Sequence, residues 1–167
     1  MTANTGRTVK RWTRFLVDDS AGTLREIPVN SINGVGLEYP EADVTAFQDA
    51  VRGVLPDTPD CTIAITGPFD TTAAAAAAAS GAAPVLSGSH TVLSAIAGGV
   101  TPLTLGIYFG VRHYWEIGEP VFGITSGAGV GFLCTSYIVN PDDGSYSATF
   151  KVYPGSTAPA WGTAAVT

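Results

Sequence analysis

A run of 41 consecutive residues, from Thr71 to Val111, contains no aspartate, glutamate, lysine or arginine. The next 30 residues contain only three charged residues. Monomeric proteins normally spread charge over their whole surface, and about 25% of residues in globular proteins are charged, against 13% here. Glycine, serine, threonine and proline interrupt every apolar stretch, so the run does not resemble a membrane helix. We therefore expect other copies of the chain to cover much of this surface.

The overall composition favours one β-rich domain. With 167 residues the chain can form one hydrophobic core, and we expect a single domain spanning residues 1–167. Glycine (20 residues) and proline (11 residues) are frequent, which is typical of strands joined by turns. The net charge of −6 argues against gripping nucleic acid through its phosphates. Residues 1–14 hold four basic residues and no apolar core of a secretory signal.

Several segments alternate apolar and polar residues, as half-buried strands do. Residues 8–17 and 23–32 predict a first hairpin, in which Pro28 indicates a sheet edge or a bulge. Residues 130–139 and 145–152 predict a second hairpin across an Asn-Pro-Asp-Asp-Gly turn. The remaining expected strands are residues 37–44, 61–67 and 103–111.

One amphipathic helix is expected over residues 45–55. Thr45 and Gln48 have the spacing of a capping box. Phe47, Val51 and Leu55 recur at helical spacing and would form one apolar face. We expect this helix to pack on a sheet.

Residues 68–100 predict an extended arm or loop. Asp70 is placed to cap a short helix through the alanine run 73–79, and the residues that follow are small, uncharged and rich in glycine. Connections of this length inside a compact domain are usually functional or disordered, and disorder normally comes with charge or polarity. We therefore expect the segment to become ordered against a neighbouring subunit.

The N-terminal segment 1–17 is the second expected arm. Basic residues fall on both faces of its strand, which suits a subunit contact better than a core position. The side chains expected at inter-subunit contacts in the two arms are Arg7, Lys10, Arg11, Trp12, Arg14, Val85, Leu86, His90, Val92 and Leu93.

The residues that carry chemistry do not form a recognisable reactive constellation. Ser89 and His90 are adjacent, but no nucleophile-elbow sequence surrounds them. Residues 127–131 read Gly-Ala-Gly-Val-Gly and lead into a strand, whereas a phosphate-binding loop opens a helix. Cys61 and Cys134 lie in strand-like runs as two buried thiols or as a bridge. We expect neither an enzyme nor a bound cofactor or metal.

In their order along the chain, the segments resemble the major tail protein, the tail tube subunit of long-tailed bacteriophages. The resemblance implies a mainly β fold, a β-sandwich or partly closed barrel flanked by one α-helix, with a long inter-subunit arm or loop. It further implies hexameric rings that stack into a hollow tube. The segments that carry it are residues 7–17, 41–55, 62–70, 87–93, 101–110 and 119–123 and the closing hairpin up to Tyr153.

The resemblance also implies a location and a set of partners. The protein would be assembled in the host bacterial cytoplasm and would reside in the virion tail, without membrane insertion. Its partners would be itself and the tape-measure, tail-terminator and baseplate or tail-tip proteins, with double-stranded DNA passing through without specific binding. Negative charge in the bore would repel DNA, and the acidic residues expected there are Asp18, Asp19, Glu38, Glu41, Asp142 and Asp143.

Two other functions fit the same sequence. A head decoration or head–tail joining protein shares the low charge and the β character, but would not polymerise along an axis. A β-sandwich carbohydrate-binding or adhesion module would use Trp12, Trp115 or Trp161 as a platform for a sugar ring.

Overall fold

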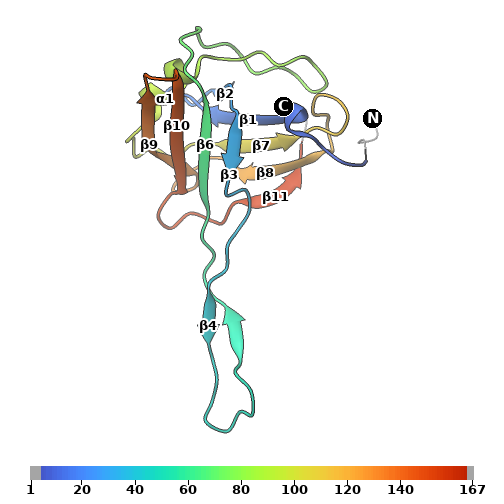
Figure 1. Cartoon of the computed structure of the whole chain (residues 1–167), viewed down its shortest axis with the longest axis vertical. Coiled ribbons are helices and arrows are strands. Elements are labelled where there is room, and N and C mark those ends of the chain that lie inside the picture. The colour runs from blue at the N-terminus through green and yellow to red at the C-terminus, as the bar shows by residue number, and fades with distance from the viewer. Residues whose placement is uncertain (1–4, 165–167) are drawn as a thin grey trace.

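Two antiparallel sheets face each other and enclose the core in the computed structural model, which describes residues 5–164 (Figure 1). The strands of one sheet run across those of the other, as in orthogonal sheet packing. The five-stranded sheet has the order β11 (Ala160–Thr163), β8 (Pro120–Ile124), β7 (Leu105–Phe109), β1 (Thr13–Asp18) and β2 (Leu24–Glu26). The four-stranded sheet has the order β3 (Ser31–Asn33), β6 (Thr62–Pro68), β10 (Ser145–Val152) and β9 (Phe132–Asn140).

Alternate residues of these strands point into one shared core. Phe15 of β1 meets Phe150 of β10 across the two sheets, with ring centroids 5.5 Å apart. Both side chains are completely buried, as are Ile107 of β7 and Phe122 of β8. The expected mainly β fold is confirmed, and the two expected hairpins form as β1–β2 and β9–β10.

Pro28 separates two sheets within a segment expected to be one strand. Residues 24–26 pair with β1, whereas residues 31–33 pair with β6 of the other sheet. The Pro28 carbonyl accepts a hydrogen bond of 2.8 Å from the buried Tyr146 hydroxyl, which fixes the corner. Proline has no amide hydrogen to give to a ladder, so the chain changes sheets where pairing would be lost.

One α-helix is present among the described residues, but not where it is expected. Helix α1 spans Ser89–Ile96 and packs on β9, with Val92, Leu93 and Ile96 buried in the core. The expected helix over 45–55 is wrong, because that part of the chain forms the tip of a hairpin between β4 (Glu41–Asp43) and β5 (Val54–Pro56).

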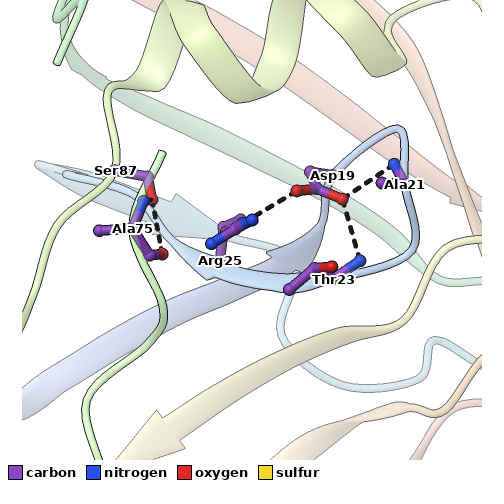
Figure 2. Close-up of polar contacts among 6 residues, drawn as sticks. All are labelled: Asp19, Ala21, Thr23, Arg25, Ala75 and Ser87. Carbon is purple, nitrogen blue, oxygen red and sulfur yellow. Dashed lines mark hydrogen bonds and ion pairs between the residues drawn. The ribbon is translucent and has the colours of Figure 1, made fainter. Parts of the chain in front are cut away.

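Residues 69–88 form a long loop over the body of the chain (Figure 1). The expected helix through the alanine run 73–79 is wrong, because these residues form no regular secondary structure. The Ser87 hydroxyl accepts a hydrogen bond from the Ala75 amide at 2.9 Å and donates one to the Ala75 carbonyl at 3.1 Å (Figure 2). These two bonds join the two halves of the loop. At its far end, the Gly81 amide donates to the Trp115 carbonyl.

Candidate assembly surfaces

A hairpin that we call the arm, residues 38–60, projects far from the body of the fold (Figure 1). Its root is a pair of backbone hydrogen bonds between Glu38 and Asp60, at 2.9 and 2.8 Å. The ladder continues through Asp57 to Pro40 and then through β4 and β5. An isolated two-stranded hairpin is marginally stable in water, so an arm of this kind normally needs a surface to lie on.

Side-chain hydrogen bonds shape the tip of the arm. The Asp43 carboxylate accepts a bond of 2.9 Å from the Thr45 amide and lies 3.2 Å from Nε of Arg52. The Asp49 carboxylate accepts a bond of 2.8 Å from the Ala46 amide. These bonds compete with helix formation, because short polar side chains offer amides an alternative partner. The tip is therefore a defined turn.

Large apolar side chains of the arm are exposed to solvent. Phe47 has an exposed fraction of 106%, and Val51 has one of 78%. Val44, Val54 and Leu55 are also exposed. Apolar side chains clustered on a projecting element are typical of a protein-binding site. The spacing that suggested a buried helix face therefore belongs to an exposed apolar stripe.

The arm also carries most of the net charge. Six of its residues are acidic and only Arg52 is basic, which gives −5 out of the −6 of the whole chain. The body therefore has almost balanced charge. Such an asymmetry favours contact with a basic surface.

A group of aromatic and basic residues gathers around the 3-10 turn Lys10–Trp12; we call it the N-terminal cluster. Trp12 stacks on His113 with ring centroids 5.9 Å apart and meets Tyr114 edge-on at 5.4 Å. The Arg11 guanidinium lies over the Trp12 ring at 4.7 Å, a cation–π contact. The other basic residues of the cluster are Arg7, Lys10, Arg14 and Arg112.

The N-terminal cluster also includes residues 112–114, and the backbone of this segment is strained at Arg112. It has φ of 65°, and among the described residues no other residue except glycine has a positive φ. A left-handed backbone conformation costs free energy in any residue that has a Cβ atom. Arg112 is exposed, so it adds positive charge beside Trp12.

Sheet edges are a third candidate surface. Strand β11 is the outer strand of its sheet, and Trp161 on it is 57% exposed although it packs against Phe109 and Phe122. Strand β9 forms the edge of the other sheet and exposes Ile138. Such edges pair readily with a strand from another chain.

The expected contact residues fall into three groups. Arg7, Lys10 and Arg11 are exposed, as are Val85 and Leu86 in the long loop. Half-buried side chains are Trp12, Arg14 and His90. The expectation that Val92 and Leu93 contact a neighbour is wrong, because both lie on the buried face of α1 with exposed fractions of 1% and 0%. The arm itself is not predicted from the sequence.

His90 is held inside its own chain. Its Nδ1 lies 3.0 Å from the Tyr137 hydroxyl, and its ring packs against Phe69. Ser89 is completely buried, and its hydroxyl donates to the Pro68 carbonyl at 2.7 Å. The two adjacent residues therefore hold α1 against neighbouring segments of the same chain.

The acidic residues expected to line the lumen lie in different parts of the fold. Asp18 is only 5% exposed, and its carboxylate accepts a 2.8 Å bond from the Thr104 amide, so its expected place on the lumen is wrong. Glu38 and Glu41 lie on the arm. Asp142 and Asp143 are exposed at the β9–β10 turn.

Asp19 shapes the β1–β2 turn (Figure 2). Its Oδ1 accepts hydrogen bonds of 2.9 Å from the amides of Ala21 and Thr23, and its Oδ2 lies 2.9 Å from Nε of Arg25. Partial burial raises the pKa of this carboxyl, but the hydrogen bonds and Arg25 outweigh burial and lower the pKa below its ordinary value. Asp19 is therefore engaged within its own turn.

The two cysteines are free and buried. Burial raises the pKa of both the Cys61 and the Cys134 thiol to about 11, so neither is a reactive thiolate at neutral pH. Within residues 5–164, no group of three or more histidine, cysteine, aspartate or glutamate side chains is placed to hold a metal ion. None of the helices in that part of the chain is long and apolar enough to cross a membrane.

The fold is similar to that of several solved structures. The chain is similar to the cap that terminates the tube of the anti-feeding prophage, with a TM-score of 0.56, 11% identity, and coverage of 98% of this chain and 96% of the other. It is also similar to the sheath/tube terminator of the PVC extracellular contractile injection system in its extended state, with a TM-score of 0.52, 13% identity, and coverage of 96% and 99%. No protein-family model and no curated protein sequence matches. The chain thus has a tail-tube-like fold.

Proposed function

We propose that this protein is a structural subunit of a phage-tail-like tube, which assembles with copies of itself into rings that stack end to end. The observation that carries the proposal is the arm, which exposes Phe47 and Val51 on a projecting hairpin. A contact between copies would bury this apolar surface and the open edges of β9 and β11.

The likeness to tube-terminating proteins over nearly the full length of both chains supports this class of function. In such an assembly the hexameric ring and its bore would pass double-stranded DNA without binding it specifically. Asp142 and Asp143, which are exposed on a body of nearly balanced charge, are our remaining candidates for the bore. The tape-measure, terminator and baseplate or tail-tip proteins would be its other partners, in the virion tail.

A second candidate is a terminating cap, which forms a single ring at the end of a tube. It is favoured because the two similar structures with TM-scores of 0.56 and 0.52 are both described as terminators. A cap would contact subunits of a tube and of a sheath rather than further copies of itself. The arm would then reach the last tube ring.

Negative-stain electron microscopy of the purified protein, together with sedimentation velocity over a concentration series, tests the proposal. Stacked rings or hollow tubes are expected for a tube subunit, and isolated rings for a cap. A monomer that persists at all concentrations, and that also fails to join tubes of a tube protein supplied in the same host, would overturn both candidates.

A further inference from the structure

We propose that the arm of one copy docks on the N-terminal cluster of a second copy, with Phe47 seated in a pocket beside Lys10. This inference rests on the proposed function. The partner is another molecule of this chain. Three observations support this contact: the shape of the pocket, the opposite charges of the two surfaces and the length of the arm.

The receptor is a cavity of about 440 Å³ between β1 and β7 on one side and the segment around β3 on the other. Its apolar wall is formed by Val29, Ile32, Val35 and Phe109. Lys10 of the N-terminal cluster also lines it. The pocket therefore offers apolar surface with a positive charge at its edge.

The tip of the arm supplies the apolar side chain that would fill this pocket. Phe47 is fully exposed at the tip, and a phenylalanine that enters an apolar pocket removes on the order of 150–250 Å² from water. The Asp43 and Asp49 carboxylates hold the amides of Thr45 and Ala46, so the backbone that carries Phe47 forms a defined turn. A preformed tip loses less conformational freedom on docking than a flexible loop.

Charge complementarity selects the N-terminal cluster as the receptor. The arm has a net charge of −5, whereas five of the eight basic residues of the chain belong to the cluster. Arg7, Lys10, Arg11 and Arg112 of the cluster are exposed. Opposite charges on the two surfaces speed encounter and disfavour other pairings.

The reach of the arm requires a second copy. Val35 in the pocket wall lies three residues before Glu38 at the arm root, whereas Phe47 lies nine residues beyond that root. At strand spacing, nine residues span about 30 Å, so Phe47 lies about that far beyond the root and away from its own pocket. The Glu38–Asp60 and β4–β5 ladder keeps the arm extended. A copy displaced by about that length along the arm would receive the tip, and such a head-to-tail contact propagates from subunit to subunit.

Complementary charge reversal tests the contact. One variant carries Glu41→Lys and Asp57→Lys in the arm, and the other carries Lys10→Glu and Arg11→Glu in the cluster. These four side chains are exposed and lie outside the core. Each variant alone is expected to lose assembly, with at least a tenfold higher critical concentration, and an equimolar mixture is expected to regain it. Lys151→Glu on β10 is the control and should still assemble, since it reverses an exposed charge outside the arm and the N-terminal cluster.

A second measurement detects the contact directly. Phe47→Cys mixed with Val29→Cys should give, under mild oxidation, a disulfide between the two variants that mass spectrometry of digested peptides identifies. Circular dichroism confirms that each variant is folded. Assembly of the Lys10→Glu and Arg11→Glu variant like the wild type, or a mixture without recovery, would overturn the arm contact while leaving the proposed function intact. A wild-type protein that never self-associates would overturn both.

Discussion

Oε1 of the buried Glu26 lies 3.1 Å from Nε of Arg14, and the two residues join the outer strand β2 to its neighbour β1. Glu26 is only 2% exposed, and burial raises the pKa of its carboxyl to about 7 although Arg14 opposes the shift. The Glu26 backbone carbonyl also accepts the Ser87 amide at 2.7 Å, so the long loop lies over this ion pair.

The raised pKa of Glu26 predicts an unusual dependence of stability on pH. Because the folded pKa of about 7 lies above the ordinary value of 4.5, the folded state binds the proton more tightly than the unfolded state. Relative to Glu26→Gln, the wild type should therefore gain about 2–3 kcal/mol as the pH falls from 8 to 5. Urea unfolding at a series of pH values measures this difference. A difference that is constant with pH would contradict the prediction.

Gly34 is expected to tolerate no side chain. Its φ is 81°, and an added Cβ would lie 1.9 Å from the Thr62 carbonyl oxygen. Gly22 has a similar φ of 77° but open space around the same position. Gly22→Ala should cost about 1 kcal/mol through backbone strain alone, and Gly34→Ala several times as much. Equal unfolding midpoints in urea for the two variants would refute this account.

Ser87 is expected to stabilise the long loop. Its side chain is completely buried and makes two hydrogen bonds with the backbone of Ala75. Ser87→Ala should lower the free energy of unfolding by about 1–3 kcal/mol, because two backbone groups lose a partner. Limited proteolysis should then cut residues 73–86 faster, whereas Ser20→Ala on an exposed turn should leave the rate unchanged. An unaltered cleavage rate in Ser87→Ala would contradict this role.

Two phenylalanines should respond in opposite ways to truncation. Phe150→Ala removes a completely buried ring from the contact with Phe15 and should cost about 3–5 kcal/mol of stability. Phe47→Ala removes a fully exposed ring and should leave the melting temperature unchanged while weakening assembly. Differential scanning calorimetry and sedimentation velocity separate the two effects. A large loss of melting temperature in Phe47→Ala would show that the tip packs within its own chain.

The strands were predictable because their alternation follows from burial on one face. Residues Thr62–Pro68 and Ser145–Val152 were anticipated closely, since each contributes alternate side chains to one core. The hairpin β1–β2 was predictable from the turn that begins at Asp19. These signals are local in sequence and do not depend on a partner.

The helices could not be predicted in the same way. Phe47 and Val51 have helical spacing, but within residues 5–164 no surface lies beneath them, and Asp43 and Asp49 bind turn amides instead. The short helix α1 draws its stability from burial of Val92 and Leu93 against β9, which local propensity does not reveal. The arm was missed because exposure, like burial, is decided by the rest of the fold.

The concentration of negative charge on the arm has a consequence for the free subunit. Without residues 38–60, the body has eight acidic and seven basic residues, a net charge of −1. Molecules near zero net charge associate and precipitate readily. The arm therefore supplies the charge repulsion that keeps the free subunit in solution, and a chain without residues 38–60 should precipitate at a lower concentration than the intact chain.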